Sequence, residues 1–151
     1  MHPWRRSAID DDGSAALEFI AVGVILLVPL IYLVIALGAV QEQTLGAEAA
    51  ARHLARVISR APDPATAAVR ADAVLAGVVA EYGLDADAVD VSVTCTPSGA
   101  ECPSAGATIL ITVATRVQLP LVPELFGLDR STAVPVEADA VQKVSRLWGA
   151  E

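Results

Sequence analysis

The sequence predicts an α+β protein: a long N-terminal transmembrane and stalk helix, a second short helix, and a small antiparallel three-stranded sheet. Three observations predict this architecture. No charged residue occurs from Phe19 to Val40, helical spacing of apolar residues continues to about position 82, and the later apolar residues alternate with polar ones. The chain has 151 residues. A membrane helix therefore leaves only about 110 residues, enough for one modest core.

The uncharged segment is long enough to cross a lipid bilayer. It covers roughly 22 positions, and an α-helix needs about 20 apolar residues to cross a hydrocarbon core about 30 Å thick. Pro29 removes one backbone hydrogen bond inside the segment, but membrane helices tolerate proline, so we expect a bend at most and no break. Arg5 and Arg6 precede the segment, and no base follows it closely, so the positive-inside rule places the N-terminus in the cytoplasm.

Helical spacing continues beyond the span and then restarts. An alanine-rich stretch that includes Leu54 and Ile58 is expected to pack on a partner helix or on the head, and Pro62 ends this helix. Asp63 and Pro64 then read as an N-cap and first helical residue, and Gly83 as a stop. The second helix is therefore expected from about Pro64 to Tyr82. Its predicted buried stripe consists of Val74, Leu75, Val78, Val79 and Tyr82.

The remaining chain has the alternating pattern of half-buried strands. The pattern predicts strands at 89–96 and 109–119, which form a hairpin, and a third strand at 132–139. Pro135 confines the third strand to an edge or an irregular position. The simplest arrangement places the sheet against the second helix. The tail, which contains Val144 and Trp148, either extends the last strand or forms a short helix.

Cys95 and Cys102 are the only cysteines, and they flank a turn-prone stretch between two predicted strands. A hairpin would bring them together. A disulfide there would stabilise the head by roughly 2 to 3 kcal/mol in the chain-entropy model and requires an oxidising compartment. The alternative is a pair of reduced, buried thiols. A zinc site needs about four ligands, which a chain with two histidines cannot easily supply, so no metal is expected.

The composition argues against several functional classes. The net charge is −8, most of the excess acid follows the apolar segment, and no basic stripe is present, so nucleic-acid binding is not expected. His53 has no serine or cysteine close in sequence, and we predict no catalytic residue. Asp85, Asp87 and Asp90 lack the glycine and distal glutamate of an EF-hand loop and are interpreted as a solvated turn. We expect no cofactor and no small-molecule substrate.

One motif stands at the start of the apolar segment. Gly13 is followed by Ser14, and then by Glu18 and Phe19, where the apolar run begins. This order resembles the type IV prepilin (class III) signal, in which a membrane peptidase cuts after the glycine and the apolar helix stays attached. The resemblance implies cleavage between Gly13 and Ser14, and an assembly site at Glu18 and Phe19 where the carboxylate pairs with a neighbouring subunit's N-terminal amine. The alternative is that Glu18 only contacts water and lipid headgroups at the membrane surface.

Three stretches of sequence narrow the prepilin resemblance to one family. Gly-Ser-Ala-Ala-Leu-Glu-Phe from Gly13, Leu-Val-Pro-Leu from Leu27 and Ala-Ala-Ala-Arg-His-Leu-Ala-Arg from Ala49 resemble the TadE-like minor pilins and pseudopilins of the tight-adherence (Flp, type IVc) pilus system, especially actinobacterial members. The resemblance implies a pilin-like subunit or assembly factor whose partners are the prepilin peptidase, the major and minor pilins of the same system, and the membrane. It implies a cytoplasmic leader at 1–13, a transmembrane and stalk helix at 14–60, and an extracytoplasmic head at 61–151. The protein would reside in the bacterial cytoplasmic membrane or in the pilus filament.

Two other classes compete with this interpretation. The first is a generic single-pass membrane protein with a small extracytoplasmic binding domain. The second, a secreted protein with a removable signal peptide, is disfavoured because the apolar segment is about twice the usual length of such a signal. The mature N-terminus distinguishes the three classes: Ser14 for the pilin, Met1 for the generic anchor, and a start after Ala36 to Ala49 for the secreted protein.

Overall fold

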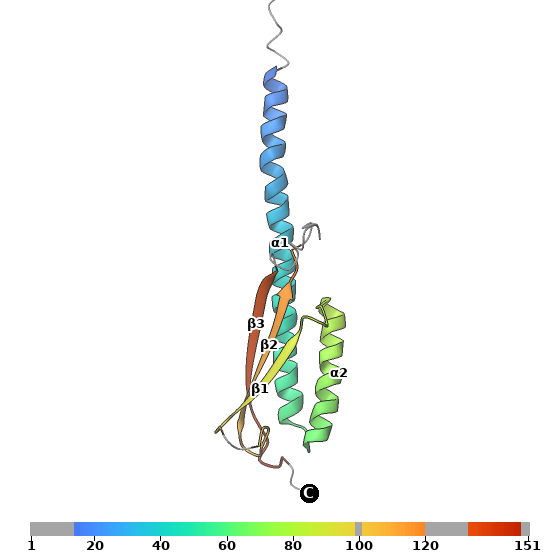
Figure 1. The fold of residues 1–151 in the computed structure, drawn as a ribbon, viewed down its shortest axis with the longest axis vertical. Coiled ribbons are helices and arrows are strands. Elements are labelled where there is room, and N and C mark those ends of the chain that lie inside the picture. Colours follow the sequence, from blue (N-terminus) through green and yellow to red (C-terminus); the bar gives the residue numbers. More distant parts are fainter. Residues whose placement is uncertain (1–13, 99–100, 120–132, 149–151) are drawn as a thin grey trace, which may run out of the picture. The chain divides into compact units, whose positions relative to one another are not determined.

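The computed structural model describes residues 14–98, 101–119 and 133–148, and within them it contains two helices and three strands (Figure 1). The helices are α1 (Ser14–Ser59) and α2 (Pro64–Tyr82), and the strands are β1 (Asp90–Thr96), β2 (Thr108–Val117) and β3 (Val134–Lys143). The predicted α+β class is confirmed. The chain divides into two compact units, Met1–Ala36 and Leu37–Glu151, and the boundary falls within α1.

α1 is a single helix that continues through Pro29, as predicted, and ends at Ser59, before Pro62. Its second part, from Leu37 onward, belongs to the larger unit. Here a stripe of small and medium-sized apolar residues is buried in the core: Ala47, Ala50, Ala51, Leu54, Ala55 and Ile58. The sequence left open whether this stripe packs on a partner helix or on the head. In the structure it packs on the head.

α2 has the predicted bounds, because both predicted caps are formed. The Asp63 backbone is extended, and its Oδ1 accepts a hydrogen bond from the Thr66 backbone N–H at 2.8 Å. This bond, with a second one from the Thr66 hydroxyl, holds the pKa of the Asp63 carboxyl below its ordinary value. At the other end Gly83 is left-handed, with φ of 60°, and its N–H donates to the Val79 carbonyl, which ends the helix.

The sheet has the order β1-β2-β3, and both pairings are antiparallel. The predicted hairpin is confirmed, since Val91 lies opposite Val113 and Cys95 opposite Ile109. β3 is an edge strand, as Pro135 predicted. β3 continues to Lys143, four residues beyond the predicted end, while the predicted start at Thr132 lies outside the described residues.

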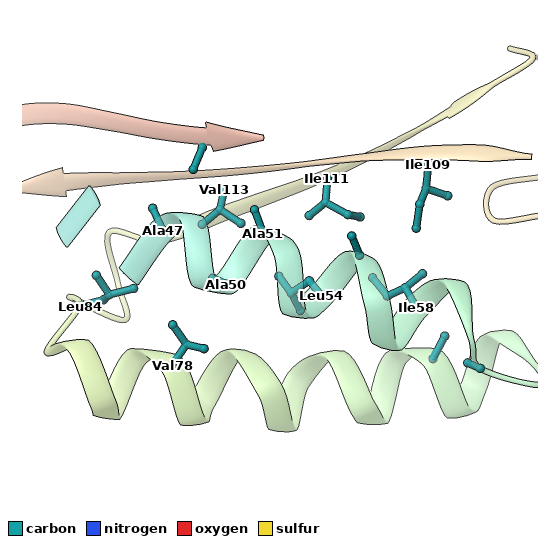
Figure 2. Close-up of a cluster of buried hydrophobic side chains, with 14 of the residues drawn as sticks. Ala47, Ala50, Ala51, Leu54, Ile58, Val78, Leu84, Ile109, Ile111 and Val113 are labelled. Carbon is teal, nitrogen blue, oxygen red and sulfur yellow. The ribbon is translucent and has the colours of Figure 1, made fainter. Parts of the chain in front are cut away.

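The core of the larger unit lies on two sides of α1 (Figure 2). On one side Ile109, Ile111 and Val113 of β2 are fully buried, and on the other side Val78 of α2 is buried. The expectation that the sheet packs against the second helix is therefore wrong. The helix that faces the sheet is α1, because its alanine-rich surface allows close packing on both sides.

Gly46 explains how closely α1 approaches the end of α2. A Cβ atom at this position would lie 2.8 Å from Tyr82 Cβ and 3.0 Å from Leu84 Cδ2. Both distances are shorter than van der Waals contact, and Tyr82 Cβ is fixed to the backbone. The packing of α1 on α2 therefore requires glycine here.

Candidate assembly site on the first part of α1

The first part of α1 carries large apolar side chains that are exposed on all sides of the helix. Leu17 is 70% exposed, Phe19 80% and Ile25 70%. Exposed apolar surface of this extent favours contact with lipid or with other apolar helices. By length and composition α1 can cross a membrane.

Glu18 is the only charged residue from Ser14 to Ala36. Its side chain is exposed, and among the described residues it has no hydrogen-bond or ion-pair partner. A carboxylate in the middle of a bilayer costs roughly 2.5 to 3.5 kcal/mol, so an ionised Glu18 favours either the membrane surface or a cationic partner. Ser14 lies four residues earlier, about 6 Å along the helix axis.

The structure describes three of the predicted assembly and cleavage residues but not the fourth. Ser14, Glu18 and Phe19 lie in the first two turns of α1, whereas Gly13 lies outside the described residues. Adjacent residues are turned by about 100° around an α-helix, so Glu18 and Phe19 point in different directions. Cleavage between Gly13 and Ser14 stays a prediction, as does the pairing of Glu18 with an N-terminal amine.

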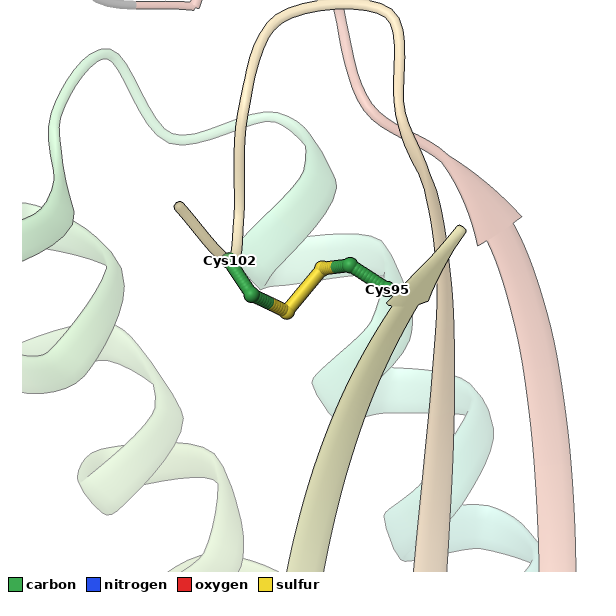
Figure 3. Close-up of a disulfide and its surroundings, with 2 residues drawn as sticks. All are labelled: Cys95 and Cys102. Atoms are coloured by element: carbon green, nitrogen blue, oxygen red, sulfur yellow. A yellow bond between two sulfur atoms is a disulfide. The ribbon is translucent and has the colours of Figure 1, made fainter. Parts of the chain in front are cut away.

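The predicted disulfide between Cys95 and Cys102 is confirmed (Figure 3). The two Cα atoms are 5.6 Å apart, within the usual range for a disulfide. Cys95 is half-buried and packs against the core, whereas Cys102 is exposed. The bond therefore ties the end of β1 to the connection that leads into β2.

No protein-family model, curated protein or solved structure matches this chain. The resemblance to TadE-like proteins accordingly depends on the residues between Gly13 and Ser59.

The other residues considered from the sequence lie on the surface of the head. His53 is exposed beside a groove of about 360 Å³ between α1 and α2, which is lined mainly by small and apolar side chains. Asp85 accepts a hydrogen bond from the Asp87 backbone N–H at 3.1 Å, which closes a turn. In the described part of the chain, no three His, Cys, Asp or Glu side chains gather closely enough to hold a metal ion.

The sequence interpretation missed a gathering of charge at one end of the head. Two cavities there share Arg116 and are lined by five carboxylates from four segments: Glu42, Asp85, Asp87, Asp90 and Glu137. A signal was present, because the 45 residues between Arg70 and Arg116 contain six acidic residues and no basic one. The contributions of Glu42 and Glu137 depend on the tertiary fold and could not be read from the sequence.

Proposed function

We propose that this chain is a minor pilin-like subunit or assembly factor of a tight-adherence (Flp) type IV pilus. A prepilin peptidase removes residues 1–13, and α1 anchors the mature protein in the bacterial cytoplasmic membrane. The N-terminus faces the cytoplasm and the head lies outside. The Cys95–Cys102 disulfide supports an external head, since disulfides persist in oxidising compartments.

Glu18 is the observation that carries this proposal. It is a lone carboxylate near the start of a helix whose other large side chains are exposed and apolar. A chain that is anchored alone in the membrane can keep this carboxylate hydrated at the membrane surface. In a packed bundle of helices the carboxylate loses that hydration and needs a compensating cation.

The amine that cleavage creates at Ser14 would supply the cation. Ser14 and Glu18 are about one helical turn apart in the same chain. Pairing between two chains therefore requires that the neighbour be displaced along the bundle axis. A helical filament displaces its subunits in this way, which supports a role in assembly.

The mass of the mature N-terminus tests processing. In cells that contain the matching peptidase, we expect wild-type protein to begin at Ser14, whereas Gly13→Ala slows or abolishes cleavage. Membrane insertion should not change, because the apolar span is intact. Gly23→Ala is the matched control, since Gly23 lies within α1 and a Cβ atom added there would meet no other atom within 4 Å. Equal amounts of mature protein from Gly13→Ala and wild type would contradict the proposal, and a start at Met1 would favour a generic anchor.

Co-purification with the major pilin tests the role of Glu18. Glu18→Ala should leave the protein inserted and folded but reduce its association with other pilins in the membrane. Glu81→Ala is the control, because it removes one exposed carboxylate from the head instead. If Glu18→Ala associates as well as wild type, Glu18 is only an interfacial residue.

A further inference from the structure

The residues that follow β3, 144–148, pack onto the end of α1, and we call them the C-terminal tail. Val144 is 2% exposed and Trp148 is 9% exposed, and both side chains belong to the buried core. The Ser145 backbone N–H donates to the Ser59 carbonyl at 3.2 Å, which holds the tail against the last residue of α1. The Trp148 N–H donates to the Ser145 carbonyl at 3.2 Å and closes the tail into a turn. The tail is therefore docked on the head by a few identifiable contacts.

The C-terminal tail also binds the connection between β1 and β2. The Val144 N–H donates to the Ala107 carbonyl at 2.8 Å, and the Gly106 N–H donates to the Ser145 carbonyl at 3.4 Å. Ala107 is buried, so part of this contact is closed to water. Gly106 and Ala107 lie outside the helices and strands. The geometry of their two hydrogen bonds to the tail therefore depends on what holds the connection in place.

The disulfide fixes this connection at one point within it (Figure 3). The connection contains 11 residues, 97–107, and Cys102 divides it so that only five residues, 103–107, separate the disulfide from β2. Gly106 and Ala107 are among these five. Without the disulfide they belong to the longer loop, and loop-closure entropy then disfavours any one arrangement of them by about threefold in an equilibrium constant. The disulfide therefore keeps both hydrogen-bonding groups near the positions that the C-terminal tail requires.

We propose that the Cys95–Cys102 disulfide is a redox latch for the C-terminal tail, which is docked in the oxidised chain and released when the bond is reduced. Release exposes the apolar side chains of Val144 and Trp148. Disulfides form in oxidising compartments and not in a reducing cytoplasm, so the tail docks only after the head has been exported. This inference goes beyond the pilin-like role and does not depend on it.

Opening of the latch needs an external dithiol and begins at the exposed sulfur. Cys102 is exposed, whereas Cys95 is half-buried. A thiolate of the dithiol attacks Cys102 Sγ, forms a mixed disulfide and displaces the Cys95 thiolate. The second thiolate of the reductant then attacks the reductant sulfur of the mixed disulfide and displaces the Cys102 thiolate. The two cysteine thiolates take up the two protons that the dithiol gave up, so the products are two cysteine thiols and a cyclic disulfide.

Tryptophan fluorescence tests the latch in the full-length chain in detergent micelles. The chain has two tryptophans, so Trp4→Phe leaves Trp148 as the one reporter. When a dithiol reduces the disulfide, and equally in Cys95→Ser/Cys102→Ser, we expect quenching of Trp148 by acrylamide to increase severalfold while the helical circular dichroism is retained. Unchanged quenching overturns the latch. Loss of the helical signal together with increased quenching also overturns it, because the disulfide is then a general staple of the head.

Thermodynamic linkage provides a second test with a matched pair of variants. If the disulfide stabilises the docked tail, the docked tail stabilises the disulfide by the same factor. Trp148→Ala removes a buried side chain of the tail, whereas Leu147→Ala removes its neighbour, which is 76% exposed. In a dithiol redox buffer, with thiols counted by mass after alkylation, we expect the equilibrium constant for reduction to rise about threefold or more in Trp148→Ala. It should keep the wild-type value in Leu147→Ala, and equal constants in all three proteins overturn the latch.

Discussion

The two parts of α1 belong to one continuous helix but differ in charge content and in surroundings. Leu26, in the first part, is 66% exposed, whereas Leu54, in the second, is 2% exposed. The first part is apolar on every side, which suits a lipid environment. The second part has arginines on one side and small apolar residues on the others, so it can pack in a water-soluble head. The comparison teaches that one continuous helix can suit two environments when its charged residues are confined to one side of its second part.

The largest expected effect comes from replacing one leucine in each part of α1. Leu54→Ala should lower the free energy of unfolding of the head by about 2 to 5 kcal/mol, because it leaves a cavity in a closed core. Leu26→Ala, which removes the same atoms from an exposed position, should leave that free energy almost unchanged. Chemical denaturation in detergent micelles measures both. Equal losses in the two variants would contradict the assignment of α1 to two environments.

The next largest expected effect on stability comes from the disulfide, which is a covalent link and not a packed side chain. Replacing Cys95 and Cys102 by serine should cost about 2.5 kcal/mol in the chain-entropy model. The loss should loosen the β1–β2 hairpin more than α1, because the bond holds the end of β1. Hydrogen exchange resolved by residue measures the two elements separately. Mass spectrometry after alkylation provides the check, since free thiols in exported protein would reject the disulfide itself.

A smaller expected effect on stability tests the close packing of the buried part of α1. Gly46→Ala should destabilise the head by about 1 to 2 kcal/mol, because overpacking outweighs the better helix propensity of alanine. Gly77→Ala in α2 is the matched control. A Cβ at Gly77 meets no atom within 4 Å, so this substitution should stabilise the head by about 0.5 to 1 kcal/mol. Opposite signs in thermal unfolding are expected, and the same sign for both would contradict the close contact at Gly46.

The smallest effect lies at the start of α2. Since folding lowers the pKa of Asp63 below 3.8, the charged cap contributes stability at higher pH and loses that contribution as the pH falls through the folded-state pKa. Asp63→Asn keeps a capping oxygen but cannot titrate. We expect wild type and Asp63→Asn to differ in melting temperature by a few degrees near neutral pH and to converge in strong acid. A difference that is constant with pH would reject this role.

Local sequence signals were sufficient to predict the helices and strands of the fold. Asp63, Pro64 and Gly83 predicted the ends of α2, and Pro135 predicted an edge strand, because caps and prolines act through their own backbone. The packing partner of the sheet was not predictable in this way. Both helices have an apolar stripe, and the choice between them depends on how closely each can approach the strands.

The candidate sites also differ in whether local sequence signals could predict them. The disulfide could be predicted because Cys95 and Cys102 are close in sequence and flank one turn. The carboxylates at one end of the head could not be predicted together, because Glu42 and Glu137 are almost a hundred positions apart and line different cavities that only the tertiary fold forms. The pairing proposed for Glu18 involves a neighbouring chain, which the sequence of one chain cannot specify.

The position of Pro135 has a consequence for solubility. A three-stranded sheet that does not close leaves backbone N–H and C=O groups unpaired along its outer strands, where further strands can add and start aggregation. On β3, proline interrupts the donor pattern, and Pro135, Glu137, Asp139 and Lys143 are all exposed. These residues discourage strand addition at β3, so copies of the chain at high concentration can collide there without merging their sheets into amyloid-like stacks.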